Sequence, residues 1–179
     1  MENKRPKSNK KFNYILFHTQ FGWCGAVRSI KGLEKFFLPY NDKIKLNALI
    51  HRQYPACKLT KIGWTSLIKK VRSYFKGKKV KFSESIDFSN GTEFQKMVWK
   101  EVLKIPLGEK ISYRELASQI GKPRSYRAVG MALSKNPLPL LVPCHRVIKK
   151  DGSIGGFSAQ GGKMLKKQML ELEAKCTIV

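Results

Sequence analysis

Acidic residues are scarce in this chain of 179 residues, which has 12 Asp and Glu against 36 Lys and Arg and a formal net charge of +24. The imbalance runs along the whole sequence, because residues 1–87 hold 20 basic and 5 acidic residues and residues 88–179 hold 16 and 7. Such an excess favours a polyanionic partner, either nucleic acid or an anionic membrane surface. The alternative is a lysine-rich surface that serves only solubility.

Cysteine and long apolar runs are also scarce. The four cysteines, at positions 24, 57, 144 and 176, include no CxxC pair, which argues against a secreted disulfide scaffold and favours reduced thiols. No apolar run approaches the roughly 20 residues of a membrane span, and the basic start MENKRPKSNKK has no apolar core of a secretory signal. We therefore expect a cytoplasmic protein, associated with the nucleoid, or a nuclear one if its source is eukaryotic.

The first half of the sequence predicts a small antiparallel sheet with helices. Three segments rich in aromatic and β-branched residues, separated by Phe21-Gly22 and Lys31-Gly32, indicate strands. These are Phe12–Gln20, Trp23–Ile30 and Leu33–Pro39. Two helices are then predicted near 42–53 and 60–76, the second from the near-helical spacing of its apolar residues. We expect a disordered basic tail over residues 1–11 and a domain over residues 12–87.

The second half, residues 88–179, predicts a mainly helical domain. Thr92-Glu-Phe-Gln95 has the form of a capping box at a helix start, and Phe94, Val98, Val102 and Leu103 could form its apolar face. Pro106 should end that helix.

Two further short helices are predicted over 113–120 and 126–134. Gly121-Lys-Pro-Arg separates them, and Ser125 could cap the second. A pair of short helices around a glycine-containing turn is a helix-turn-helix candidate, although many helical pairs look this way.

The chemistry gathers at Pro143-Cys144-His145-Arg146, which follows an apolar run. Pro143 fixes the backbone before the cysteine, and the cationic neighbours could favour the nucleophilic thiolate. The alternative is a buried structural cysteine with a histidine merely next to it.

Several motifs in order resemble the O6-alkylguanine-DNA alkyltransferases, also called methylated-DNA–protein-cysteine methyltransferases. They are Ile111-Ser-Tyr113, Arg127-Ala-Val-Gly130, Asn136-Pro137, Pro143-Cys-His-Arg-Val147, Gly155-Gly-Phe-Ser158 and Leu170-Glu-Leu-Glu173. The resemblance covers about residues 94–173, whereas residues 1–87 match only in outline. It implies an α+β protein with a small ribonuclease-H-like N-terminal domain and a mainly helical C-terminal domain that contains a helix-turn-helix.

By this resemblance, Cys144 is the acceptor of the alkyl group and His145 is the base that draws its proton through water. Glu173 orients and charges His145, with Glu171 as the competing carboxylate because the segment Ser158–Gly162 is longer than in some relatives. The displacement needs neither a metal nor an organic cofactor.

Three polar residues have implied roles with plainer alternatives. Tyr113 resembles the donor to N3 of the departing guanine, or else is a half-buried core tyrosine. Ser158 resembles the donor to O6, or is a surface turn residue. Asn136 resembles the hinge between the recognition helix and the cysteine loop, or caps that helix.

Duplex DNA is the implied partner, with the damaged nucleotide turned out of the stack. Arg127 resembles the finger that fills the gap, or is an ordinary phosphate contact. Small residues, Ala128, Gly130 and Ala132, would let the helix enter the minor groove closely and read little sequence. Residues expected to contact the substrate are Leu133, Val147 and Phe157.

Some positions depart from the family pattern. Met131 replaces a small residue, and Phe157 replaces a tyrosine and its hydroxyl. Some relatives bind zinc in the N-terminal domain, and here that would require the fold to gather four residues whose spacing matches no zinc pattern. These are His18, Cys24, His51 and Cys57.

The function implied is a single transfer per monomer from O6-alkylguanine, and also from O4-alkylthymine, in double-stranded DNA to Cys144. Two rivals stay open. One is a lesion-binding module of the same architecture without catalysis, against which Cys144 argues. The other is a cysteine hydrolase that uses Cys144 and His145.

Overall fold

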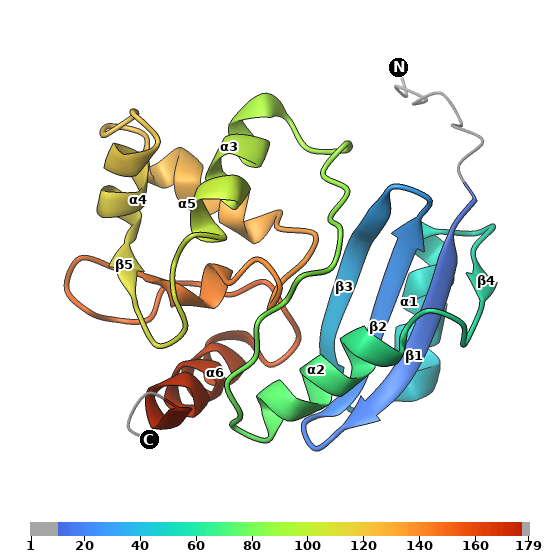
Figure 1. The fold of residues 1–179 in the computed structure, drawn as a ribbon. Coiled ribbons are helices and arrows are strands. Elements are labelled where there is room, and N and C mark those ends of the chain that lie inside the picture. The colour runs from blue at the N-terminus through green and yellow to red at the C-terminus, as the bar shows by residue number, and fades with distance from the viewer. Residues whose placement is uncertain (1–10, 177–179) are drawn as a thin grey trace.

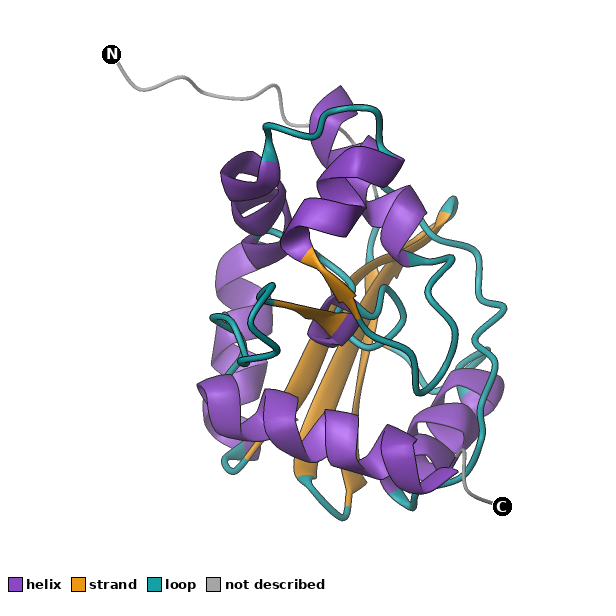
Figure 2. Cartoon of the chain, turned by 90° about the vertical axis from the view of Figure 1, so that its left-hand side faces the viewer, coloured by secondary structure: helices purple, strands orange, loops and turns teal. Residues whose placement is uncertain are grey.

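The computed structural model describes residues 11–176 of the chain. An N-terminal sheet with two helices lies against a helical C-terminal part (Figure 1). Figure 2 shows the strands near the centre with helices around them. Apart from Lys11, the predicted basic tail lies outside the described residues.

The N-terminal sheet contains β1 (Asn13–Thr19), β2 (Gly22–Ser29), β3 (Gly32–Tyr40) and β4 (Lys58–Leu59). Its strand order is β3-β2-β1-β4, with β1–β2 and β2–β3 antiparallel and the short β4 parallel to β1. The turns fall at the two predicted glycine dipeptides, so the expected meander is present with bounds within two residues.

Helices cover both faces of this sheet. On β1, Ile15 and Phe17 point into the core that α2 (Thr65–Phe75) covers, while Tyr14 and Leu16 face the cluster under α1 (Lys43–Gln53). Because side chains alternate between faces and both faces are covered, the strands carry apolar residues on both faces. The second helix begins at Thr65, later than the predicted position near 60.

The segment between the two parts, residues 76–92, is fastened to the sheet edge. Leu33 N donates to Ser85 O at 2.8 Å, and Asp87 N donates to Leu33 O at 2.7 Å. At Gly32 a Cβ would lie 2.5 Å from Ser85 O, so only glycine allows this approach. The division near residue 87 therefore falls in a paired strand-like segment rather than in a free linker.

The C-terminal part begins with α3 (Glu93–Val102), for which Thr92 and Gln95 form the predicted capping box. Val98 and Val102 are fully buried, but Leu103 is 40% exposed because the helix ends before it and Leu103 is its C-cap. The predicted apolar face is thus correct except at Leu103.

The helix-turn-helix consists of α4 (Tyr113–Gln119) and α5 (Tyr126–Ser134). Ser112 caps α4 in a second capping box that sequence reasoning missed. Ser125 stands at the N-cap of α5, but its side chain makes no capping hydrogen bond, and its φ of −95° and ψ of 20° are not extended. The predicted role of Ser125 as a cap is therefore wrong.

Four further elements complete the C-terminal part. The 3-10 turn η1 (Cys144–Arg146) leads into β6 (Val147–Ile148), which pairs in parallel with β5 (Ile111–Ser112). The last helix, α6 (Gly162–Cys176), packs against η1.

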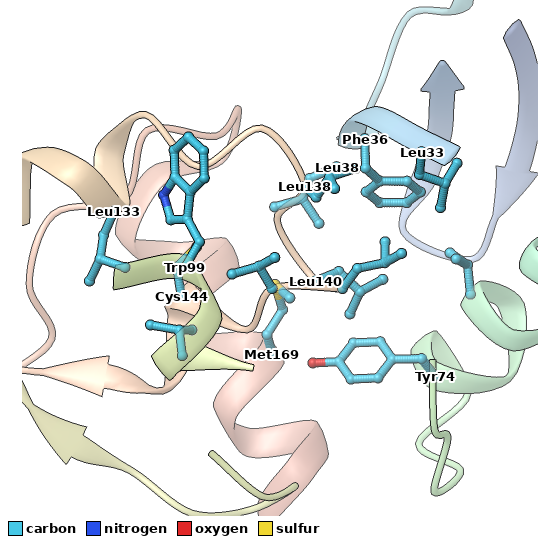
Figure 3. Close-up of a cluster of buried hydrophobic side chains, with 14 of the residues drawn as sticks. Leu33, Phe36, Leu38, Tyr74, Trp99, Leu133, Leu138, Leu140, Cys144 and Met169 are labelled. Carbon is cyan, nitrogen blue, oxygen red and sulfur yellow. The ribbon is translucent and has the colours of Figure 1, made fainter. Parts of the chain in front are cut away.

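The two parts share one hydrophobic core (Figure 3). It joins residues of the sheet and α2, among them Leu33, Phe36, Leu38 and Tyr74, to residues of the C-terminal part, among them Trp99, Leu138, Leu140 and Met169. The expected α+β class, a sheet domain followed by a helical domain with a helix-turn-helix, is confirmed.

Candidate active site

The loop between α5 and η1 sets the position of Cys144. Asn136 donates its amide to Val142 O at 2.9 Å, and Asn136 Oδ1 accepts from Leu138 N at 3.0 Å. Leu140 has a φ of 79°, a left-handed conformation that is strained for a residue other than glycine. Cys144 N then donates to Val142 O at 2.7 Å. Asn136 therefore holds the loop from within, and the C-cap of α5 is Lys135 rather than Asn136.

Behind the cysteine lies a buried ionic cluster. His145 Nε2 lies 2.7 Å from Glu173 Oε1, and Arg146 reaches the same carboxylate with Nε at 2.8 Å from Oε2 and a terminal nitrogen at 3.0 Å from Oε1. Gly108 N also donates to Oε2, at 3.3 Å. The carboxylate against His145 is thus Glu173, whereas Glu171 is exposed and lies near Lys167 at 3.9 Å.

These contacts set the charges in the cluster. Burial opposes ionisation of Glu173, but hydrogen bonds from His145 and Arg146 outweigh it and lower its pKa to about 2. Burial lowers the pKa of His145 against the opposing influence of Glu173, so the imidazole is neutral at neutral pH. Nδ1 of His145 is buried and has no hydrogen-bond partner among the described residues. A neutral imidazole with Nε2 directed at a carboxylate keeps Nδ1 as a proton acceptor.

The thiol of Cys144 is protonated at rest. Burial raises its pKa, although the hydrogen bond from Asn136 and the charge of Lys166 act in the opposite direction. Arg146, which sequence reasoning placed beside the thiol as a favourable cation, is occupied by Glu173 and by Ile105 O at 2.6 Å. The cation whose charge acts on the sulfur is Lys166 of α6, a residue that sequence reasoning missed.

Lys166 is almost fully buried, and its Nζ donates to Val147 O at 2.6 Å. Burial lowers its pKa to about 8, against the charge of Cys144, which raises it. Its position one turn before Met169 on the buried face of α6 was the available signal, because a lysine at an apolar position of a helix is unusual.

A cavity of about 400 Å³ opens beside Cys144. Its lining includes Tyr113, Gly130, Leu133, Phe157 and Ser158. This volume lies within the range of small-molecule pockets. The structure therefore brings together around the thiol most of the residues predicted to contact the substrate.

Of the residues predicted to contact the substrate, Val147 lies away from the cavity, and the hydroxyl of Ser158 is engaged by the protein. Val147 is fully buried in β6 and does not line the cavity, because its side chain belongs to the core. The Ser158 hydroxyl lies at the rim and donates to Ser134 O at 3.0 Å, which ties the loop after β6 to the end of α5.

Tyr113 begins α4 and its ring edges the cavity. Burial and the nearby Cys144 raise its pKa, so the phenol stays a hydrogen-bond donor. Gly155 lies against it so closely that a Cβ there would be 2.5 Å from the hydroxyl oxygen.

The outer face of α5 is open. Arg127 and Ala128 are exposed, and Met131 is 64% exposed on the same face. Ala132, predicted to lie on this face, is instead buried, and its carbonyl accepts from Trp99 Nε1 at 2.9 Å. The Arg127 guanidinium lies 5.8 Å from the centre of the Tyr126 ring.

No group of three or more histidine, cysteine, aspartate or glutamate side chains within residues 11–176 could hold a metal ion. His51 Nδ1 lies 3.9 Å from Cys57 in the cluster under α1, but His18 packs against Trp23 and Cys24 is buried in the core that α2 covers. The fold does not gather the four residues considered for zinc. Over the same range, no helix is both long and apolar enough to cross a membrane.

Comparison with known proteins places this chain. A family model described as "6-O-methylguanine DNA methyltransferase, DNA binding domain" matches residues 93–175. A methylated-DNA–protein-cysteine methyltransferase of Methanosarcina barkeri is 45% identical over 108 residues, which are 59% of this chain and 65% of that protein. One of Mycobacterium leprae is 41% identical over 121 residues, 64% of this chain and 72% of that protein.

The likeness extends to the whole fold. The crystal structure of Mycobacterium tuberculosis OGT in complex with DNA has a TM-score of 0.77 and 31% identity, and the match covers 92% of this chain and 94% of that one. The alignment with the Methanosarcina protein spans slightly less than two thirds of that relative, and the structural match includes the N-terminal sheet as well. The predicted family is confirmed: this chain belongs to the methylated-DNA–protein-cysteine methyltransferases.

Proposed function

We propose that this protein repairs double-stranded DNA by moving an alkyl group from O6 of guanine, and also from O4 of thymine, onto Cys144. The observation that carries the proposal is a buried thiol at a cavity, followed by a neutral imidazole whose Nε2 is held by Glu173 at 2.7 Å. A Cys–His pair oriented by a carboxylate is the arrangement of an activated nucleophile.

The displacement follows from these positions. The proton of Cys144 passes to Nδ1 of His145, bridged by a water molecule, and Glu173 stabilises the imidazolium. The sulfur lone pair forms the bond to the alkyl carbon as the bond from that carbon to O6 breaks, and its electron pair stays on guanine.

Tyr113 stabilises the leaving group. Its phenol, kept protonated by burial, donates to N3 of guanine as negative charge develops there. The guanine then takes a proton from solvent, and His145 returns its proton to solvent. The thioether on Cys144 is stable, so each molecule acts once.

The base reaches the cavity by turning out of the duplex, since the alkylated atom is otherwise inside the stack. We place the exposed face of α5 in the minor groove, with Ala128 and Gly130 allowing close approach and Arg127 filling the gap in the stack. Leu133 and Phe157 enclose the base. Ser158 donates to O6 once its hydroxyl turns from Ser134 O.

We expect the protein to act as a monomer, without metal or organic cofactor, at the nucleoid or, if its source is eukaryotic, in the nucleus. The excess of 36 Lys and Arg over 12 Asp and Glu supports binding to the phosphate backbone with little sequence preference.

Intact mass after incubation with a duplex that carries one O6-methylguanine tests the proposal. We expect each protein molecule to gain a single methyl group in place of a proton, and peptide mapping to find it on Cys144. Cys144→Ser should lose the transfer and keep DNA binding, whereas the matched variant Cys57→Ser should react like the unchanged protein. A methyl group on another cysteine contradicts the proposal.

The same experiment separates the rival functions. Binding to the modified duplex without mass gain would indicate a lesion-binding module. Continued turnover of a substrate by Cys144 without a stable adduct would indicate a hydrolase.

A further inference from the structure

One residue of the N-terminal domain reaches the buried cluster behind Cys144. Tyr74, on α2, donates its hydroxyl to Glu173 Oε1 at 2.9 Å. The hydroxyl oxygen of Tyr74 lies 3.3 Å from His145 Nε2. Tyr74 is 3% exposed, and its ring extends from α2 toward α6 (Figure 3). Tyr74 and Glu173 are 99 positions apart in the chain.

The donors and acceptors of this trio fix one another. A phenol has a single proton, and Tyr74 gives it to Glu173, so its oxygen can only accept from His145. Both neighbours of Nε2, the Tyr74 oxygen and Glu173 Oε1, are therefore acceptors, which requires the proton of the neutral imidazole to be on Nε2. The lone pair is then on Nδ1.

The hydroxyl is held in place by its helix. Gly77 O, just after α2, accepts from the Cys176 thiol at the end of α6 at 2.7 Å, so the ends of the two helices are joined. On its other side α2 is anchored to the sheet, where Arg72 Nε donates to His18 O at 3.0 Å. Burial and the charge of Glu173 raise the pKa of Tyr74 well above 10, so the phenol keeps its proton.

We propose that Tyr74 is a positioning residue which the N-terminal domain supplies to the active site, and that it holds His145 in the Nε2–H form that withdraws the proton of Cys144. The inference rests on the proposed function, because proton withdrawal from Cys144 is the step it serves. Tyr74 does not touch the reacting atoms, since it faces the ring nitrogen directed away from that step.

Other charged groups act on the same trio and are unchanged in the test. Arg146 of η1 and Lys166 of α6 both disfavour the imidazolium, and Glu173 favours it. Arg146 also lowers the pKa of Tyr74, and Cys176 of α6 raises it.

The test is Tyr74→Phe, which keeps the ring and removes only the hydroxyl. The matched control is Tyr14→Phe, because Tyr14 is also a buried tyrosine of the N-terminal domain, hydrogen-bonded to Asn47 at 2.9 Å and His51 at 3.0 Å. Tyr14 belongs to the cluster under α1, whereas Cys144 belongs to the core that α2 covers. The probe is iodoacetamide, and peptide mass follows its reaction with Cys144 from about pH 6 to about pH 10, across the ordinary pKa range of imidazole and thiol.

We expect Tyr74→Phe to react about tenfold more slowly near neutral pH, which is the effect expected when the charged Glu173 behind the base His145 loses a hydrogen bond. The deficit should shrink as pH rises, because hydroxide then removes the thiol proton without His145. Tyr14→Phe should match the unchanged protein at every pH. A Tyr74→Phe profile that matches the unchanged protein, or is slower by the same factor at every pH, overturns the inference.

A second measurement does not depend on any variant. Nitrogen-15 NMR of the unchanged protein should show the proton of His145 on Nε2, and a proton on Nδ1 overturns the inference. Neither measurement needs DNA. Failure of methyl transfer from the modified duplex would count against the proposed function, while these two results would still decide the role of Tyr74.

Discussion

Asn136 donates its side-chain amide to the carbonyl oxygen of Val142 at 2.9 Å, so a residue just beyond the C-cap of α5 fixes the segment leading into Cys144. Its own hydrogen bond to the Cys144 thiol lowers the pKa of that group against the larger effect of burial. The proposed DNA-facing helix and the proposed nucleophile are therefore linked through one buried side chain. A chemical change at the sulfur should alter the stability of the segment that Asn136 holds.

Alkylation of Cys144 should destabilise the protein. The sulfur is buried in a loop with a strained Leu140, and added carbon atoms at a packed site typically cost about 1–3 kcal/mol. We expect the methylated form to melt a few degrees below the free protein, and the benzylated form to melt lower still. Thermal unfolding of the three forms measures this. Equal or higher melting temperatures after alkylation would show that the cavity accommodates the group without disturbing the loop.

Glu173→Gln should be strongly destabilising. The carboxylate is 1% exposed and is the anion that faces Arg146, and breaking a buried ion pair on one side costs about 3–5 kcal/mol. Glu171→Gln is the control two positions away, since Glu171 is exposed and its loss should change the free energy of unfolding by less than about 0.5 kcal/mol. Urea unfolding at neutral pH compares them, and similar losses for both variants would contradict the burial of the pair.

The same carboxylate predicts loss of stability in acid. The pKa of Glu173 is about 2 in the folded protein and lies below its ordinary value of 4.5, so the unfolded chain binds a proton first as pH falls. The contribution of Glu173 is complete above pH 4.5 and disappears as pH falls through about 2. His145 acts in the same direction below its ordinary pKa of 6.5, because burial keeps it neutral in the folded protein. Unfolding free energies measured against pH should therefore fall more steeply for the unchanged protein than for Glu173→Gln.

Arg127→Ala should slow repair of duplex DNA far more than reaction with free O6-benzylguanine. The free base needs no unstacking, which costs a few kcal/mol in a duplex. Arg124→Ala removes the same charge from the exposed turn before α5 and serves as the control. Single-turnover rates on the two substrates decide the role, and equal losses on both would remove Arg127 from base extrusion.

Gly155→Ala should slow alkyl transfer by displacing Tyr113. A Cβ at position 155 would lie 2.5 Å from the Tyr113 hydroxyl oxygen, which must then move from the place where it meets the guanine. Gly156→Ala is the neighbouring control, because a Cβ there meets nothing within 4 Å. Transfer rates from a modified duplex should be reduced for Gly155→Ala and little changed for Gly156→Ala. Equal rates would show that Tyr113 is not needed at its present position.

Much of the fold could be predicted because its signals are local. The second and third strands of the meander start at Gly22 and Gly32, and the capping box at Thr92 starts α3, as their neighbours in sequence indicate. Cys144 and His145 are neighbours within one motif, and Asn136 lies in another motif eight positions before Cys144. Ser125 shows the limit of such signals, since a capping residue in the right position still needs an extended backbone to reach the helix amides.

The sequence by itself determined the family, the proposed nucleophile with its neighbouring imidazole, and the order of the elements, because each depends on residues within a turn or a motif. Only the tertiary structure decided which carboxylate serves His145. Residues 171 and 173 are separated by about 200° around a helix, so the packing of α6 buries Glu173 and leaves Glu171 in solvent. The tertiary structure also decided that burial raises the pKa of Cys144 and that Lys166 is the cation acting on this thiol. It brings Tyr74 of the N-terminal domain to Glu173 in the buried ionic cluster. These are contacts between distant segments and the desolvation that packing imposes, and neither has a period or spacing that a sequence displays.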